Sequence, residues 1–227
     1  KAMTAVAAAL IATAPALMAG GPDDDTMVIN GEIEIVTKTA APAHLDGALD
    51  EIMSGWRFRD DTTQAMQMDD FDNPAMLAVE DALEIWATAD GSEGKSCMDC
   101  HGAAEDMAGV KPVYPKWNEA AGEVYTLQMQ VNDCRENRMG AEPWKVDASD
   151  ALAMEGLLSS VSRGMPMNVA IDGPAQSTWE QGKELYYTRT GQLDLSCATC
   201  HEQNYGIINV VRGARARAAE YEAQLAQ

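Results

Sequence analysis

The spacing of apolar and polar residues changes character along the chain. Near the start, two short β-prone runs, 27–29 and 32–36, flank Asn30-Gly31. Asn-Gly between such runs is typical of a tight type I′ turn, so we predict a small β-hairpin. The next apolar positions recur at helical spacing and predict a short helix over about 45–56: Leu45, Leu49, Ile52 and Met53.

Helical spacing dominates the rest of the chain. Residues 119–134 are predicted to form a helix in which Leu127, Met129 and Val131 are partly buried. Residues 147–160, rich in Ala, Leu and Met, predict another, and "PVYPKW" between the two regions predicts a loop. No long alternating strand follows residue 70. The expected fold class is therefore mainly all-α with one small N-terminal hairpin.

Part of the chain is repeated at an offset of one hundred residues. Aligning 72–101 with 172–201 without a gap gives 11 identities in 30 positions: Asp72, Pro74, Ala75, Glu80, Glu84, Thr88, Gly91, Ser96, Cys97, Cys100 and His101. Each copy predicts a helix of three to four turns that starts at Pro-Ala and is followed by a Gly break. Such self-similarity indicates two related domains formed by internal duplication.

The extreme N-terminus has the layout of a secretory signal peptide. Lys1 precedes an apolar run, 2–19, and small residues allow cleavage after Ala16 or Ala19. The run is about long enough to span a membrane, but it is mostly Ala, so export with cleavage is the favoured interpretation over an anchor. We expect a periplasmic protein without a membrane span in the mature chain.

These signals together divide the chain into four parts. They are a signal peptide at 1–20, an N-terminal extension at 21–68, a first repeat domain at 69–165 and a second at 166–227, which looks incomplete.

The charge balance limits the choice of partners. The chain carries 36 acidic and 16 basic residues, a formal charge of -20. Such a surface repels nucleic acid and anionic lipid, and suits basic or selectively docking partners.

The repeat carries the pattern Cys-x-x-Cys-His in both copies, as "SCMDCHG" and "SCATCHE". This is the attachment pattern of c-type haem, in which two cysteines form thioethers and the histidine binds the iron. We therefore expect two covalent haems, one on Cys97, Cys100 and His101, and one on Cys197, Cys200 and His201.

Three other interpretations of the cysteines compete with this one. A single Cys₄ zinc site would leave both following histidines unexplained, although the chain has only three. Redox dithiols lack the βαβ context that they need, and structural disulfides leave one of the five cysteines over.

The sixth position of the first iron has two kinds of candidate. One is Cys134, whose thiolate would lower the potential, with Arg135 as a further counter-charge. The other kind is a methionine, which raises the potential: Met139, Met154, Met165 or Met167. Spacing alone leaves this choice open, because a free cysteine is often buried and a methionine at helical spacing is usually a core residue.

Several stretches together resemble the SoxA family, the dihaem cytochrome subunits of the periplasmic SoxAX complex of sulfur oxidation. The resemblance covers about 29–206 and rests on "SGWRFRDDTTQAMQMDDFDNPAML", "SCMDCHG", "VNDCRENRMG", "SRGMPMNVAIDGPA" and "GKELYYTRTGQLDLSCATCHEQNYG". It implies an all-α fold of two cytochrome c-like domains, and Cys134 as the distal ligand of the first haem.

The resemblance also implies an activity, that of an L-cysteine S-thiosulfotransferase subunit. Thiosulfate would be joined oxidatively to a cysteine of the carrier protein SoxYZ, and two electrons would leave through haem to the SoxX cytochrome. Two other functions stay open: a pure electron carrier, and a thiosulfate dehydrogenase that forms tetrathionate.

The chain departs from the family pattern after the second motif. The family has a further cysteine there, a catalytic persulfide that binds the second iron, and this chain has Ala214 in the corresponding "VVRGARARA". The catalytic residue is therefore unknown. The second iron is open, or is bound by a partner or an earlier residue, or the sequence is shortened or frame-shifted; the last is the expectation we favour. The remaining tail predicts an Ala-rich surface helix.

Overall fold

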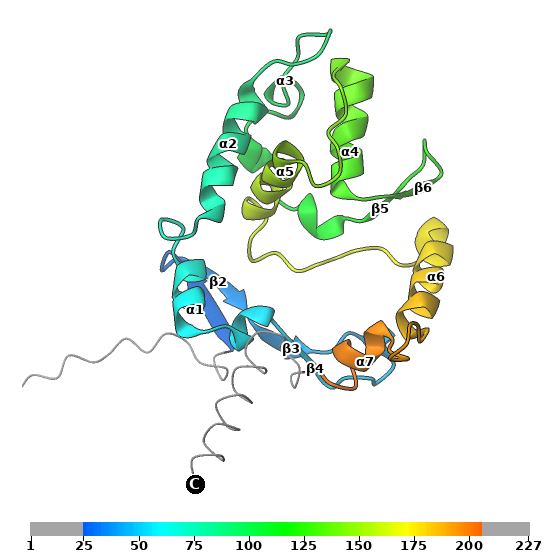
Figure 1. Cartoon of the computed structure of the whole chain (residues 1–227). Coiled ribbons are helices and arrows are strands. Elements are labelled where there is room, and N and C mark those ends of the chain that lie inside the picture. Colours follow the sequence, from blue (N-terminus) through cyan, green and yellow to red (C-terminus); the bar gives the residue numbers. More distant parts are fainter. Residues whose placement is uncertain (1–24, 206–227) are drawn as a thin grey trace, which may run out of the picture.

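The computed structural model describes residues 25–205 (Figure 1). The expected signal peptide, 1–20, and the expected tail helix lie outside the described residues. Between residues 25 and 205 the chain forms helices and three separate pairs of short antiparallel strands. No helix in this part is long and apolar enough to cross a membrane.

The predicted N-terminal hairpin is confirmed. Strands β1 (Thr26–Ile29) and β2 (Ile33–Val36) pair antiparallel with Ile29 opposite Ile33. Asn30 and Gly31 both adopt positive φ, 53° and 71°, and the Glu32 amide donates to the Ile29 carbonyl at 3.0 Å. These are the features of a type I′ turn, with Glu32 as one extra residue before the pairing begins.

The helix predicted over 45–56 is wrong. Only a single turn, η1 (Ala43–Leu45), forms, because Asp46 and Gly47 turn into the left-handed region at φ 52° and 79°. Strand β4 (Glu51–Met53) then pairs with β3 (Lys38–Ala40), and η2 (Gly55–Phe58) follows. Cross-strand pairing therefore prevails over the helical spacing of the apolar positions in this segment.

Helix α1 (Asp61–Met68) closes the N-terminal extension. It starts at Asp60, whose carboxylate accepts from the Thr63 amide at 2.9 Å. Inside, Gln64 is fully buried and exchanges hydrogen bonds with Trp56: the indole donates to the Gln64 carbonyl and the Gln64 amide donates to the Trp56 carbonyl.

The hydrophobic core lies in the first repeat unit. Helices α2 (Ala75–Ala87) and α5 (Ser149–Ser160) pack against each other, and α4 (Leu127–Cys134) contacts α5. The buried cluster is Ala82, Trp86, Ala104, Leu127, Ala153, Met154, Leu157 and Leu158. The helix predicted over 147–160 is confirmed as α5, which starts two residues later.

The helix predicted over 119–134 is correct only in its second half. Strands β5 (Lys116–Asn118) and β6 (Glu123–Tyr125) form a hairpin first. The Asn118 side chain accepts from the amides of Ala120 and Ala121, both at 3.0 Å, and thereby makes the turn. Thr126 then caps α4 by accepting from the Met129 amide at 3.2 Å. Short turns fill the intervals: η3 (Ala104–Met107), η4 (Lys111–Val113) and η5 (Arg135–Met139), a π-turn.

The local structure of the sequence repeat recurs. In the first copy α2 is followed by a turn closed by an Asp90–Lys95 bridge and by α3 (Met98–His101). In the second, η6 (Gly173–Ala175) and α6 (Gln176–Tyr187) precede a Thr190–Leu195 bridge and α7 (Cys197–His201). Even the helix ends agree, because the hydroxyl groups of Thr88 and Thr188 each donate to a glutamate carbonyl four residues back, at 2.7 Å.

The two copies differ in what covers them. Helix α6 has no buried residue, and up to residue 205 no counterpart of α4 or α5 follows it. Instead the N-terminal extension lies beside it (Figure 1). His44 meets the Trp179 ring edge-on, Lys183 pairs with Asp46 at 2.9 Å, and the Tyr205 hydroxyl donates to the Met53 carbonyl at 3.2 Å.

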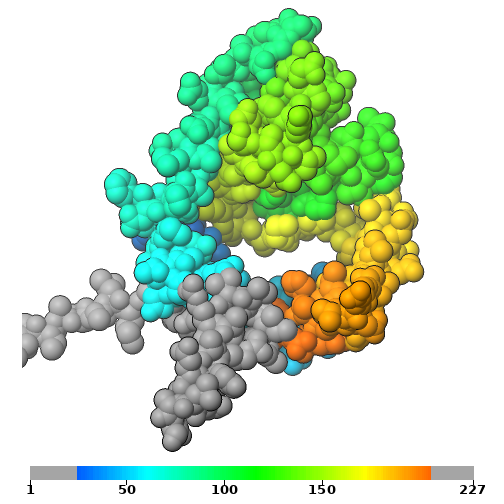
Figure 2. All heavy atoms as spheres, viewed as in Figure 1, coloured from blue at the N-terminus to red at the C-terminus, as the bar shows by residue number. Residues whose placement is uncertain are grey.

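The division into domains at 69–165 and 166–227 stays a prediction. The space-filling view shows an opening between the two units (Figure 2).

A bidentate ion pair joins the N-terminal hairpin to the core. Arg163, just after α5, donates to both carboxylate oxygens of Asp70, at 2.7 and 2.8 Å. Asp70 is held in turn by Asn30 of the β1–β2 turn, through two hydrogen bonds of 2.9 Å. Hydrogen bonding to the Arg163 guanidinium holds the pKa of the Asp70 carboxyl below its usual range.

Replacing Asp70 by Asn should therefore destabilise the fold at neutral pH. Because both side chains are about a quarter exposed, solvent screening keeps the expected loss at about 1–2 kcal/mol. An acid with a lowered folded pKa stabilises above its unfolded pKa, about 4, and loses that contribution as the pH falls. Urea unfolding at pH 7 and pH 3 should show a difference between wild type and variant that shrinks in acid. Asp72→Asn, at an exposed neighbour, is the control, and an equal effect there would contradict the role of the pair.

Candidate functional site: a cavity between Cys-x-x-Cys-His and Cys134

The first Cys-x-x-Cys-His segment forms one capped helical turn. Asp99 accepts from the amide and the hydroxyl of Ser96, at 2.7 and 2.9 Å, and the Ser96 hydroxyl accepts from the Asp99 amide. The amides of Cys100 and His101 both donate to the Cys97 carbonyl, at 3.2 and 3.0 Å. The turn is thus fixed at its start, and its two cysteines and histidine line the same cavity.

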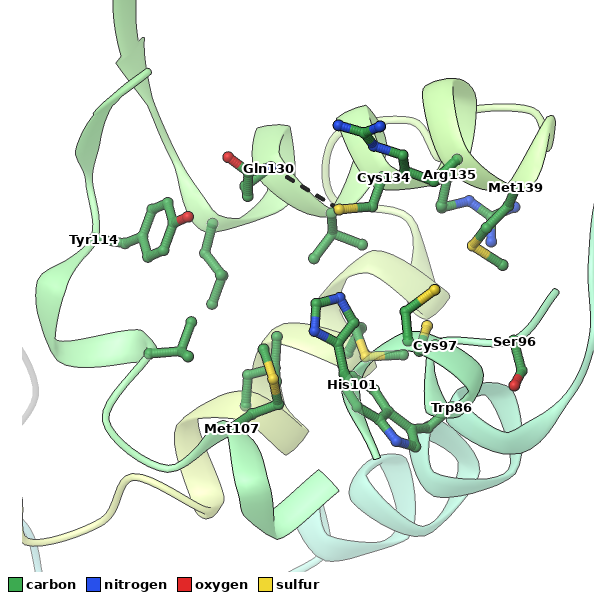
Figure 3. Close-up of a pocket in the computed structure, with 17 residues that line it drawn as sticks. Trp86, Ser96, Cys97, His101, Met107, Tyr114, Gln130, Cys134, Arg135 and Met139 are labelled. Atoms are coloured by element: carbon green, nitrogen blue, oxygen red, sulfur yellow. Dashed lines mark hydrogen bonds between the residues drawn. The ribbon is translucent and has the colours of Figure 1, made fainter. Parts of the chain in front are cut away.

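This cavity has a volume of about 350 Å³ and lies inside the first repeat unit (Figure 3). Three cysteines and one histidine line it: Cys97, Cys100, His101 and Cys134. Its remaining wall is chiefly apolar and comes from α2, η3, the residue before η4, α4, η5 and α5: Trp86, Met107, Val110, Leu127, Val131, Met139, Met154 and Leu158. An apolar site with a few soft metal ligands suits a large planar cofactor such as haem.

Trp86 supports the histidine side of the cavity. The Trp86 ring is 3% exposed and lies 5.9 Å from the His101 ring, centroid to centroid. Its indole N–H donates to the Gly102 carbonyl at 2.9 Å. The end of α3 is thereby attached to α2, which limits the positions that His101 can adopt.

Cys134 lies at the end of α4, across the cavity from His101 (Figure 3). The amide of Gln130 donates to its sulfur at 3.9 Å. Burial raises the pKa of the Cys134 thiol, and Gln130 and Arg138 act in the opposite direction. Burial likewise raises the pKa of Cys97.

The methionine candidates separate into two groups. Met139 and Met154 line the cavity, whereas Met165 and Met167 are 45% and 67% exposed and are not among its lining residues. Met154 is also a central core residue that packs with α2. Cys134 and Met139 therefore remain as the candidates for the distal ligand of the first haem iron.

Arg135 has a different role from the counter-charge expected for Cys134. Its guanidinium is buried and donates to Asp90 at 2.8 Å and to the Glu142 carbonyl at 3.1 and 3.0 Å. It also stacks on the Trp144 ring at 4.0 Å. Arg135 directly follows Cys134 in the chain, and through Asp90 it binds the turn that precedes Cys97. Arg138, not Arg135, is the arginine whose charge lowers the pKa of Cys134.

Gly91 and Gly140 lie where two backbone segments of this unit approach each other closely. A Cβ at Gly91 would lie 2.6 Å from the Ala141 nitrogen and closer still to the Met139 carbonyl oxygen. The amides of Ser92 and Glu93 donate to the carbonyls of Gly140 and Met139, at 3.1 and 3.0 Å. The turn before Cys97 is therefore docked on the π-turn after Cys134, which holds the two sides of the cavity at a set separation.

The second motif has the same turn but different surroundings. Ser196 and Thr199 cap α7 as Ser96 and Asp99 cap α3. The cysteines and His201 are exposed, and among the described residues nothing lies within 4 Å of a Cβ placed at Gly191. Across residues 25–205 no group of three or more His, Cys, Asp or Glu could hold a metal ion, so the shared Cys₄ zinc site gains no support. Within residues 25–205 no disulfide joins any of the five cysteines.

Sequence reasoning missed three residues of the cavity region. Gln130 and Arg138 act on Cys134. Gln130 lies outside the quoted motifs, and Arg138 lies in "VNDCRENRMG", where nothing distinguished it from its neighbours. Gly140 had a weak signal, as a glycine closely following the Cys134 segment. Its importance depends on a contact with Ser92 that only the folded chain provides.

The fold and the cavity define the class of protein: a cytochrome c domain, which carries covalently bound haem c. The family model "SoxA/TsdA, cytochrome c domain" matches residues 81–167. Two SoxA subunits of L-cysteine S-thiosulfotransferase are similar over most of the chain. That of Rhodovulum sulfidophilum is 58% identical over 88% of this chain and 71% of its own length. That of Paracoccus pantotrophus is 48% identical over 89% and 72%.

A solved structure agrees with these relatives. The crystal structure of SoxXA from P. pantotrophus matches with a TM-score of 0.78 and 47% identity, over 84% of this chain and 73% of that one. The chain belongs to the SoxA family.

The docking of the two turns can be tested with a matched pair of glycines. Gly91 and Gly191 have nearly the same φ, 70° and 72°, so alanine should meet the same left-handed strain of about 1 kcal/mol at both. Gly91→Ala must also displace the backbone at 139–141, and should cost about 2–4 kcal/mol in total. Equal losses in chemical denaturation of the two holoproteins would contradict close docking.

Proposed function

We propose that this chain is the haem subunit of an L-cysteine S-thiosulfotransferase. The observation that carries the proposal is its 58% identity, over 88% of its residues, to a subunit of that name. In the proposed reaction the terminal sulfur of thiosulfate forms a bond with a carrier cysteine: R–SH + S₂O₃²⁻ → R–S–S–SO₃⁻ + H⁺ + 2e⁻. The thiol proton goes to solvent, and haem supplies one-electron redox chemistry to accept the two electrons in turn.

The first haem is assigned to the cavity. Cys97 and Cys100 would hold it through thioethers, His101 would bind the iron from the α3 side, and Cys134 from the α4 side. The opposed positions of His101 and Cys134, and the apolar wall between them, support this assignment. The surrounding apolar residues would exclude water from the iron ligands, and a bound thiolate would hold the potential low.

A second haem is assigned to Cys197, Cys200 and His201. The recurrence of the helix, the bridged turn and the capped motif supports it, and also supports an origin by duplication of a cytochrome c-like unit. Its distal ligand has no assignment. We place the sulfur chemistry at this second unit. A thiolate ligand would lower the potential of the first haem, and a haem of low potential accepts electrons poorly from another centre.

The proposed partners are a SoxX cytochrome, the SoxYZ carrier protein and thiosulfate, in the periplasm. The similarity to a chain of a SoxXA complex supports the first of these. The apolar, export-type pattern at 2–19 supports the location. The charge of -20 favours protein partners over nucleic acid.

A second candidate function is electron transfer without sulfur chemistry. The observation that favours it is Ala214, which stands in "VVRGARARA" at the position where the resemblance places the family's cysteine. A thiosulfate dehydrogenase that releases tetrathionate is a third.

Cys134→Ala should abolish the low-spin thiolate EPR signal of the first haem and raise its potential. Haem staining and intact mass should still show two haems on wild type and on the variant, since Cys134 forms no thioether. Met139→Leu, which changes the competing cavity residue, is the control and should keep the thiolate signal. An unchanged spectrum in Cys134→Ala, with a changed one in Met139→Leu, would assign the ligand to methionine instead.

The activity is tested with the purified chain, a SoxX cytochrome, the carrier protein and thiosulfate. Mass spectrometry should find the carrier cysteine extended by one thiosulfate group, and the cytochrome should be reduced by two electrons per group added. Tetrathionate without carrier modification would favour the dehydrogenase. Neither product, with haem still reducible, would favour the electron carrier.

A further inference from the structure

A second pocket adjoins the cavity on the side of Tyr114. It has a volume of about 270 Å³ and shares Tyr114 and Gln130 with the larger cavity. Its other lining residues come from strand β5 and the turn after it, and they are mostly polar: Lys116, Trp117, Asn118, Glu119 and Ala120. A polar annex to an apolar cofactor cavity is suited to a polar group carried by that cofactor.

Trp117, one of the residues that line this pocket, carries a buried donor without an acceptor. Its indole nitrogen is inaccessible to solvent, and within residues 25–205 no acceptor lies within hydrogen-bonding distance of it. An indole N–H can only donate, and leaving a buried donor unpaired is unfavourable. The neighbouring carboxamide does not fill the need, since the Asn118 side-chain oxygen is already engaged with two backbone amides, at Ala120 and Ala121. A bound group that carries an acceptor would supply the missing partner.

The orientation of a c-type haem would bring such a group to this place. Its thioethers form along one edge of the macrocycle, and its two carboxylates project from the opposite edge. In Figure 3 Cys97 and Tyr114 lie on opposite sides of the cavity, with His101 between them. A haem attached at Cys97 and Cys100 would therefore direct its carboxylate edge toward Tyr114 and the pocket behind it.

This pocket is lined by one basic residue, Lys116, and one acidic residue, Glu119. Lys116 lies at the pocket and is exposed, in a chain with only 16 basic residues against 36 acidic ones. Its exposed ammonium can turn toward a carboxylate, and Glu119, also exposed, can turn toward solvent. Trp117 has less freedom, because its backbone is paired with Val124 in the β5–β6 hairpin.

We propose that Trp117, supported by Lys116, is the receptor for one carboxylate of the first haem. The inference rests on the haem attachment proposed above for Cys97 and Cys100. The indole N–H would donate to the carboxylate inside the pocket and keep it ionised where water is scarce. That negative charge would favour the ferric iron and lower the potential further, in the same direction as a thiolate ligand.

Trp117→Phe in the full-length holoprotein tests the proposal. The potential of the first haem is followed through its low-spin EPR signal in redox titrations over a range of pH. Loss of a charge-assisted donor should raise the pH at which the carboxylate takes up its proton by about one unit or more. The potential at neutral pH should rise, and the propionate bending band in resonance Raman spectra should shift.

The matched control is Trp179→Phe, the same change on α6, where the ring faces His44 and Lys183. It should leave the titration of the first haem unchanged. If Trp117→Phe carries its full haem and titrates like wild type, with an unshifted Raman band, the proposal is wrong. If that variant does not mature, the exposed Lys116→Gln decides: a smaller shift in the same direction supports the receptor, and no shift overturns it. Absence of the first haem from the wild-type protein, by intact mass, would instead refute the attachment itself.

Discussion

The close approach of two backbone segments, at Gly91 and at 139–141, is the constraint on which the first unit depends. It joins the turn before the Cys-x-x-Cys-His helix to the turn after Cys134, with no room for a side chain between them. Arg135 adds to the same joint by binding Asp90 from the other side. Because the packed helices α2 and α5 hold the rest of the wall, this joint is what sets the separation of His101 and Cys134.

The second unit shows what the same sequence pattern becomes without that joint. Thr190 stands where the first copy has Asp90, so an arginine could find no carboxylate there. Leu193 and Leu195 replace Glu93 and Lys95 and are 80% and 41% exposed. The turn and the capped motif nevertheless keep their form, which shows that these are local structures specified by residues within the repeat. The burial of a motif is decided by segments that lie outside it.

Much of the fold follows from local patterns, and the errors have physical causes. The Asn30-Gly31 turn, α5 and both repeat helices were predictable, because turn chemistry and helical spacing act over a few residues. The helix expected over 45–56 failed because strand pairing with 38–40 overrides apolar spacing. Half of the helix expected over 119–134 was lost to the turn made by Asn118.

The site divides in the same way. The cysteines and histidine of the first motif could be identified from their spacing, and Cys134 could be placed only among several candidates. The structure reduces that choice, since Met165 and Met167 lie away from the cavity. The roles of Gln130, Arg138 and Trp117 could not be identified, because the sequence does not show which residues each of them contacts. Their significance comes from neighbours brought together by tertiary packing.

The hydrogen bond between Tyr205 and Met53 spans 152 residues and has a consequence for the order of assembly. Strand β4, which contains Met53, makes this contact only when Tyr205, one of the last described residues, has reached its position. Contacts this distant form slowly, since a long loop has to be ordered first. The segment that carries Cys197 and Cys200 is therefore among the last of the described parts to be fixed against the N-terminal extension.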